Sequence, residues 1–134
     1  MTERSRLRHQ SGQETLQAML AVAFMLLPVL FGIIELSGLV HIWIGQQSAA
    51  AIGARVAGER GEDDSLVRDR ITVELRAAGL DPAHVQVTVA PAYAHWGQPI
   101  TVRLLSRQHV SIPFLFSRDV MLTSSYVGRG EVNH

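Results

Sequence analysis

The hydrophobic pattern of the chain changes sharply after its first third. Between residues 16 and 44 the only distinctly polar residues are Gln17, Glu35, Ser37 and His41. About 20 apolar residues cross the hydrocarbon core of a bilayer, so this run is long enough to span a membrane. A secretory signal peptide is the alternative, but its apolar core typically covers about 7–15 residues before a small-residue cleavage site. The small residues 48–51 lie too far beyond the run, which favours a retained anchor.

The charged flanks of the apolar run predict its direction. Arg4, Arg6 and Arg8 precede the run, whereas the first basic residue after it is Arg55. Basic residues beside a span stay in the cytoplasm, so we expect the N-terminus inside and everything after the span outside. The predicted protein is therefore anchored by a single span.

Helical periodicity continues past the membrane edge. Three- and four-residue spacing joins Leu36, Leu39, Val40, Trp43, Gln47, Ala50 and Ala54. A helix from about Gln13 to Gly58 would be ~70 Å long at 1.5 Å per residue, and only ~30 Å of it fits in hydrocarbon. Residues 13–60 therefore predict a transmembrane helix that continues as an amphipathic stalk. Pro28 removes one hydrogen bond inside the span, which predicts a kink there.

Small residues recur along the same helix. They are Gly32, Gly38, Gly45 and Gly53, with alanines at positions 49–51. One interpretation is that they allow another element to approach the helix closely. The other is that glycine is merely tolerated in membrane helices. The sequence leaves both open.

Beyond Gly61 the pattern predicts a short helix and then strands. Asp63 and Asp64 are candidate caps for a helix that Gly79 ends. Its apolar stripe comprises Val67, Ile71, Leu75 and Ala78. Alternation with a period of two follows at residues 85–89, at 100–105 with a continuation toward 112, and at 120–127. Three strands without intervening helices favour an antiparallel meander, so the predicted fold class is α+β.

The part after residue 60 forms a small head, residues 61–134, outside the membrane. A domain of this size buries a modest fraction of its surface and is marginally stable by itself. We therefore expect its sheet or its short helix to pack against the stalk, so that head and stalk share one core.

Composition narrows the function classes. Twelve Lys and Arg balance twelve Asp and Glu, giving a formal net charge of zero, which argues against a nucleic-acid partner. The absence of cysteine excludes disulfides, thiolate metal sites and a cysteine nucleophile. The sequence contains no GxSxG, phosphate-loop or HExxH motif, and its six histidines show no close pair at ligand spacing. We expect no metal, no cofactor and no enzymatic activity.

Two apolar clusters in the head are candidate contact surfaces. Tyr93, His95 and Trp96 lie in a turn-rich loop over residues 91–99. They suit either a partner contact or packing under the neighbouring hairpin. The cluster at residues 112–116, Ile-Pro-Phe-Leu-Phe, has the same two interpretations, core or docking surface.

The N-terminal third resembles a known family. Residues 11–18 read Ser-Gly-Gln-Glu-Thr-Leu-Gln-Ala and lead into a leucine-rich span with Leu27-Pro28, then Gly-Ile-Ile-Glu at 32–35 and an alanine-rich helix after Gln46. This order resembles the N-terminus of TadE-like pseudopilins, minor pilin-like proteins of tight-adherence (type IVc) pilus systems. The resemblance covers residues 11–58, and the remainder agrees in being a small head that ends on strands.

The resemblance implies a processing site. Residues 1–12 would be a basic cytoplasmic leader, and a prepilin peptidase would cut after Gly12 to leave Gln13 as the new N-terminus. Pilin-like proteins usually carry a glutamate at the fifth position after the cut. Here that position is Gln17, and a carboxylate occurs earlier, at Glu14. The chain therefore departs from the family pattern at the residue that usually pairs charges.

Glu35 is the carboxylate inside the apolar run, and it has two interpretations. Twenty residues counted from Leu16 place it at the outer membrane edge, where it reaches headgroup water. Alternatively, it lies between helices of an assembled bundle, paired with a neighbour's cation or N-terminal amine. With Glu14, Gln17 and Pro28, it is a candidate for helix packing and charge pairing.

The resemblance implies a non-catalytic subunit of a type IVc pilus or a related secretion filament, held in the bacterial cytoplasmic (inner) membrane. Its partners would be other pilin-like subunits, the pilus assembly platform, the prepilin peptidase and membrane lipid. The alternative is an unprocessed single-span accessory protein whose head binds an envelope or secretion-machinery partner.

Overall fold

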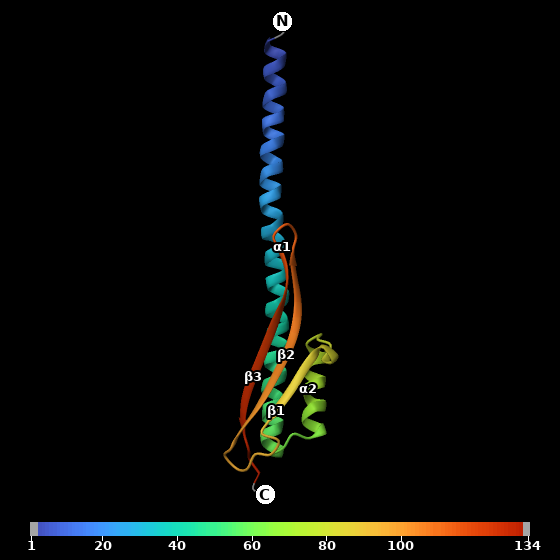
Figure 1. The fold of residues 1–134 in the computed structure, drawn as a ribbon, viewed down its shortest axis with the longest axis vertical. Coiled ribbons are helices and arrows are strands. Elements are labelled where there is room, and N and C mark those ends of the chain that lie inside the picture. The colour runs from blue at the N-terminus through green and yellow to red at the C-terminus, as the bar shows by residue number, and fades with distance from the viewer. Residues whose placement is uncertain (1–2, 133–134) are drawn as a thin grey trace.

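The computed structural model describes residues 3–132, and side chains from Gly12 onward. Its elements, in chain order, are helix α1 (Glu3–Arg60), helix α2 (Ser65–Ala77), the short 3₁₀ helix η1 (Pro82–His84) and strands β1 (Val85–Ala90), β2 (Pro99–Ile112) and β3 (Phe116–Arg129). The fold is α+β, as predicted. Figure 1 shows an elongated molecule in which α2 and the sheet lie along the C-terminal part of α1, and the N-terminal part of α1 stands bare.

Helix α1 is longer than the sequence pattern predicts. It begins at Glu3 instead of near Gln13 and ends at Arg60, because propagation of an existing helix into residues of good helix propensity costs little. The backbone of the expected leader, from residue 3 to residue 12, is therefore continuous with the span. The helix also runs through Pro28 without interruption (Figure 1), so the kink expected there does not break it.

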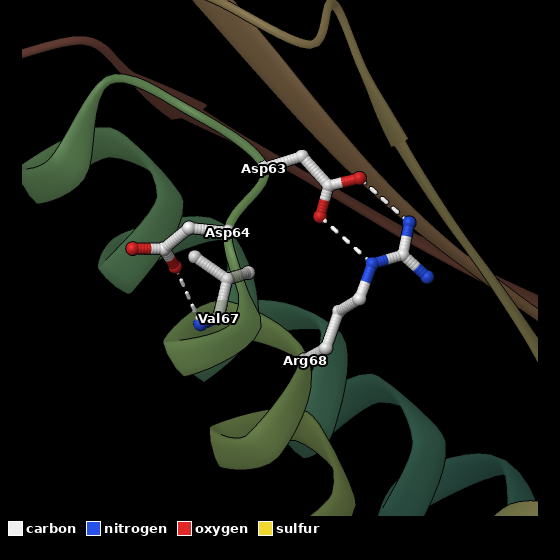
Figure 2. A network of polar contacts seen from close by, with 4 residues as sticks. All are labelled: Asp63, Asp64, Val67 and Arg68. Atoms are coloured by element: carbon white, nitrogen blue, oxygen red, sulfur yellow. Dashed lines mark hydrogen bonds and ion pairs between the residues drawn. The ribbon is translucent and has the colours of Figure 1, made fainter.

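The start of α2 is held by two neighbouring aspartates (Figure 2). The Oδ1 atom of Asp64, the N-cap residue, accepts a hydrogen bond of 2.9 Å from the backbone N–H of Val67. Asp63 receives two hydrogen bonds from the Arg68 guanidinium, at 3.1 and 2.6 Å. The predicted cap is confirmed, and it fixes the direction in which α2 leaves the end of α1.

The end of α2 follows the predicted pattern as well. Gly79 has a φ of 75°, and the N–H of Leu80 reaches back to the carbonyl of Leu75 at 2.9 Å. This left-handed residue satisfies carbonyls that the helix end would otherwise leave open.

The sheet is an antiparallel meander in the order β1-β2-β3. Val87 lies opposite Leu104 in the first pair, and Ile112 lies opposite Phe116 at the far end of the second. Strands β2 and β3 are 14 residues each. The predicted continuation of β2 toward residue 112 is confirmed, whereas β3 is longer than its alternation predicts. Beyond Ser106 the strand β1 no longer accompanies them, so the polar residues there break the alternation while the two strands still pair.

One face of the sheet and the apolar stripe of α2 share a core with α1. The α1 side of this core consists of small residues that are fully buried: Ala49, Ala50, Ala54 and Ala57. Val67, Ile71 and Leu75 contribute from α2, and Val89, Ile100, Val102 and Leu104 from the sheet. The expectation that the head packs on the stalk is confirmed.

The glycines at positions 32, 38, 45 and 53 have two interpretations, as sites of close approach or as merely tolerated residues, and the structure shows both cases. A Cβ at Gly53 would lie 2.7 Å from the Cδ1 atom of Ile71, and one at Gly45 would lie 2.9 Å from the Cβ of Ala78. These two positions let α2 and the segment after it approach α1 closely. Gly38 faces open space, and Gly32 has only an ordinary contact, 3.5 Å, with Ile112.

Candidate functional site

The largest unpartnered surface of the described chain is the N-terminal half of α1. Its leucine, isoleucine, methionine and phenylalanine side chains are exposed, up to 79% at Met25. The helix is long and apolar enough to cross a membrane, with a mean hydropathy of 2.4 over its most apolar stretch, which is not buried in the protein. Soluble monomers rarely expose a contiguous apolar surface of this size, so this half of α1 needs lipid or other helices around it.

The candidate pairing residues on α1 lie at opposite ends of this surface. Glu14 and Gln17 are exposed near its start, and Glu35 is half-buried near its end. Glu14 and Glu35 are separated by ~31 Å of helix, so one molecule cannot bring them together. Within the described residues, Glu35 has neither a hydrogen bond nor an ion pair. Its position fits both interpretations given by the sequence.

The candidate processing site lies within the helix. Gly12 and Gln13 are both exposed, and a Cβ added at Gly12 would meet nothing within 4 Å. A peptidase binds its substrate strand in an extended form, so cleavage after Gly12 requires local unwinding of α1. The glycine lowers the cost of that unwinding, since glycine is a poor helix former.

A buried polar contact joins the two halves of the core, and the sequence pattern missed it. Gln46, fully buried on α1, donates from Nε2 to the Oγ of Ser106 on β2. Its Oε1 atom and the Oγ of Ser124 have no hydrogen-bond partner among the described residues. A groove of about 320 Å³ lies next to Gln46, lined in part by His41, His84 and Gln108. Buried amides are costly without partners, so this contact fixes how the helix and sheet are aligned.

The apex of the β2–β3 hairpin lies beside α1 at the point where the bare N-terminal part of the helix begins (Figure 1). The rings of Phe24 and Phe114 have centroids 5.2 Å apart at an interplanar angle of 40°. The Cδ1 of Ile112 approaches Gly32, as described above. The cluster at residues 112–116 is therefore the apex of a hairpin that reaches the predicted span, a position that the sequence alone does not reveal.

A chain of polar side chains crosses the same hairpin just behind the apex. Ser117 Oγ lies 2.9 Å from His109 Nε2, and His109 Nδ1 lies 2.8 Å from Asp119 Oδ1. The hydrogen bond from His109 holds the pKa of Asp119 below its ordinary value, and Arg107, 3.9 Å away, adds to the effect. Sequence reasoning missed this cluster, although cross-strand pairing of His109 with Asp119 brings it together.

The order Ser, His, Asp is that of a hydrolase triad, but the surroundings differ from those of an active site. A triad acts where an oxyanion hole and a low dielectric favour charge development. The side chains of His109 and Asp119 are 63% and 50% exposed on the outer face of the hairpin. Water screens them there, so we interpret the cluster as a polar collar that aligns the two strands.

The aromatic loop before β2 lies at the end of the head farthest from the span. Its backbone is tied to the α1–α2 connection, since Asp63 donates to the carbonyl of Ala92 and Ala94 donates to that of Gly61. Tyr93 and Trp96 are 70% and 65% exposed, and His95 is exposed too. These side chains do not pack under the hairpin, and a partner contact there stays a prediction. A groove of about 420 Å³ runs beside Tyr93 and His95.

In the part of the chain that the structure describes, no group of three His, Asp or Glu side chains lies close enough together to bind a metal ion. The features with chemical meaning are thus an apolar helix face, a half-buried carboxylate, a hairpin apex and an aromatic loop. Comparison of the chain with protein-family models, with curated proteins and with solved structures gives no match.

Proposed function

We propose that this protein is a non-catalytic, pilin-like membrane subunit of the TadE-like kind, which assembles into a type IVc pilus or a related secretion filament. The observation that carries the proposal is the division of α1: one continuous helix is bare and apolar over its first half and packed into a small head over its second. Such a subunit sits in the bacterial cytoplasmic membrane by its bare half, with the N-terminus in the cytoplasm and the head outside.

Assembly in this proposal proceeds by lateral packing of bare helices. In lipid no hydrophobic force drives helices together, so close van der Waals packing and polar contacts decide which surfaces associate. Gly38 faces open space within the described chain, and it offers a neighbouring helix a close approach. Glu35, one turn away, offers a carboxylate without a partner of its own.

The position of Glu35 constrains the register of such a filament. After cleavage the α-amine of Gln13 would start the helix, ~33 Å before Glu35 at 1.5 Å per residue. An ion pair between Glu35 and a neighbour's amine therefore requires adjacent subunits to be shifted by about that distance along the filament. The earlier carboxylate, Glu14, lies beside its own amine and suits a pair between subunits that are barely shifted.

N-terminal sequencing of the membrane-extracted protein tests processing. A start at Gln13 in cells with a prepilin peptidase supports the proposal, whereas an intact leader contradicts it. Gly12→Val is the matched variant, since the open space around Gly12 accommodates the side chain and the head stays folded. We expect this variant to retain its leader. Equal electrophoretic masses for wild type and variant, with and without peptidase, exclude processing after Gly12.

Co-purification with neighbouring subunits tests the role of Glu35. We expect Glu35→Gln to insert and accumulate like the wild type but to recover much less of its partners. Glu62→Gln, on the connection between α1 and α2, is the control that removes a carboxylate outside the membrane. Equal recovery of partners by Glu35→Gln and wild type leaves Glu35 as an interfacial residue.

The second candidate function is an unprocessed accessory protein whose head binds an envelope partner. The exposed aromatic loop with Tyr93, His95 and Trp96 favours it, because aromatic side chains are enriched at the centres of protein interfaces. The double variant Tyr93→Ser, Trp96→Ser would then lose its partner while keeping an intact leader. If the pilin-like proposal holds, the double variant keeps its assembly with neighbouring subunits.

A further inference from the structure

We propose that the apex of the β2–β3 hairpin, residues 112–116, inserts into the outer leaflet of the membrane beside the span of its own chain. Its ligand is the hydrocarbon of the bilayer. The inference goes beyond the proposed function, since it concerns a single subunit before any assembly.

The height of the apex along α1 carries the argument. If the hydrocarbon begins near Leu16, its outer edge lies at about Glu35, ~30 Å further along the helix. Ile112 contacts α1 at Gly32, ~5 Å inside that edge, and Phe114 contacts Phe24, which lies ~16 Å inside it. Whatever surrounds α1 at these levels must also surround the apex.

The side chains of the apex match that environment. Phe114, Leu115 and Phe116 are 76%, 64% and 52% exposed in the isolated chain, and no charged residue lies between Ile112 and Phe116. Polar and charged residues resume at once on both strands, at Ser111 and at Ser117, and continue into the polar collar. An apolar tip followed by a polar collar is the pattern expected of an element that enters hydrocarbon from the headgroup region, because polar and charged side chains are costly inside it.

The backbone of the turn gives a second indication. Ile112 accepts a hydrogen bond of 3.1 Å from the N–H of Leu115, and Phe114 has a φ of 67°. Proline second and a positive φ third describe a type II turn, whose third position ordinarily takes glycine or asparagine. A bulky residue at positive φ is strained. The chain places a phenylalanine ring at that position, against Phe24, where glycine would suit the backbone better.

Two positions of the turn bring no free N–H into hydrocarbon. Pro113 has no N–H, and the N–H of Leu115 is already bonded within the turn. Exposed strand edges are not tolerated in the bilayer core, which limits insertion to the turn from Ile112 onward and leaves the longer part of β2 and β3 in the headgroup region or outside. The apex is thus a second anchor, and with the span it fixes how the head stands on the membrane.

The absence of cysteine from the chain allows a direct test. The full-length protein with Leu115→Cys, labelled with a polarity-sensitive nitrobenzoxadiazole dye, is placed at one chain per nanodisc of phosphatidylcholine and phosphatidylglycerol. We expect blue-shifted emission and quenching by mid-chain spin-labelled lipid, several-fold stronger than for the same label at Tyr126→Cys. Tyr126 is the matched control, since it is also an exposed apolar site on the hairpin strands but lies near the far end of β3.

Three outcomes decide the proposal. Strong quenching at position 115 in singly occupied nanodiscs supports it. Quenching at 115 no stronger than at 126 overturns it. A blue shift at position 115 that appears only when several chains share one disc overturns it too, because the apex then binds a second copy. Adding Phe114→Gly, which suits the backbone and removes the ring, should weaken the quenching at 115, whereas Phe114→Leu should keep most of it. These measurements use unassembled protein, so their failure leaves the assembly tests of Glu35 and Gly12 intact.

Discussion

The two halves of α1 use hydrophobic residues in opposite ways. In the bare half, large side chains such as Phe24, Met25 and Ile33 are more than half exposed. In the packed half, the buried positions carry alanine and glycine apart from Gln46, and Gly53 meets Ile71 directly. The packed half of the helix therefore contributes mainly small side chains to the core, and the larger apolar groups of the core come from α2 and the sheet.

This difference reflects which elements cover each half of α1. The packed half approaches α2 and the sheet so closely that most of its buried positions are alanine or glycine, and most of the core volume comes from the partner elements. The large groups of the bare half have little such cover within the described chain, where Phe114 contacts Phe24. The same 58-residue helix thus has one half covered by the rest of the chain and one half that the described chain leaves largely uncovered.

The largest effect should come from deleting core volume opposite the packed half. Leu104 is fully buried on β2, and Leu104→Ala should lower the free energy of unfolding of the head by about 2–5 kcal/mol. Leu30→Ala, on the bare half, should change it by less than about 0.5 kcal/mol. Thermal unfolding in detergent followed by circular dichroism measures both. Similar losses for the two variants would mean that the halves do not differ as described.

A charge in the bare half should affect insertion instead of folding. Leu26→Arg places a cation near the bilayer centre, at a cost of about 2.5–3.5 kcal/mol on the insertion scale. We expect a large drop in the membrane-inserted fraction, measured by alkaline extraction of membranes. Leu66→Arg, at an exposed site on α2, is the matched control and should remain inserted. An unchanged fraction for Leu26→Arg would contradict the assignment of the span.

A large side chain should destabilise the head at Gly53, where α1 contacts α2, but not at Gly38. Gly53→Leu forces α2 away from α1 and should destabilise the head by about 1–3 kcal/mol. Gly38→Leu meets open space and should leave the stability of the head unchanged while weakening assembly. Chemical denaturation in detergent distinguishes the two. If Gly38→Leu destabilises the isolated head as much as Gly53→Leu, the division of the glycines is wrong.

The smallest effect should come from the cap that joins α1 to α2. Asp64→Ala removes the hydrogen bond to Val67 and should cost about 1 kcal/mol near neutral pH. That hydrogen bond, and to a lesser extent Arg60, lowers the pKa of Asp64 below 3.8 in the folded state. The stabilisation is therefore present above the unfolded pKa and is lost as the pH falls through the folded one.

A pH series checks this prediction. The difference in melting temperature between wild type and Asp64→Ala should shrink as the pH falls below 3.8. Asp69→Ala, an exposed carboxylate on the same helix, should show no such trend. A difference that stays constant down to the lowest pH would show that the cap does not act through the carboxylate.

Local features of the fold could be predicted well. Periodicity identified the apolar stripe of α2, alternation identified the three strands, and cap chemistry located Asp64 and Gly79. These features depend on neighbours within a few residues. The early start of β3 could not be predicted, because the pairing of residues 117–119 with residues 109–111 is held by backbone hydrogen bonds, and the mixed side chains there show no alternation.

The candidate sites divide in the same way. The sequence pointed to the span, to Glu35 and to the aromatic loop, since each is visible in composition alone. It did not point to the Gln46–Ser106 contact or to the His109–Asp119 pair, whose members are far apart in sequence or separated by the hairpin turn. No local pattern marks such pairs.

By itself, the sequence determined that one apolar helix would dominate this protein, and that a short helix and a three-stranded meander would follow it, because hydrophobic period and turn chemistry are written residue by residue. Only the tertiary structure decided which half of that helix is covered, and that the apex at residues 112–116 lies beside the span. Those outcomes depend on the register between α1 and the hairpin, which is set by shape: small residues where the sheet must approach, and a buried Gln46 that meets Ser106 in one alignment.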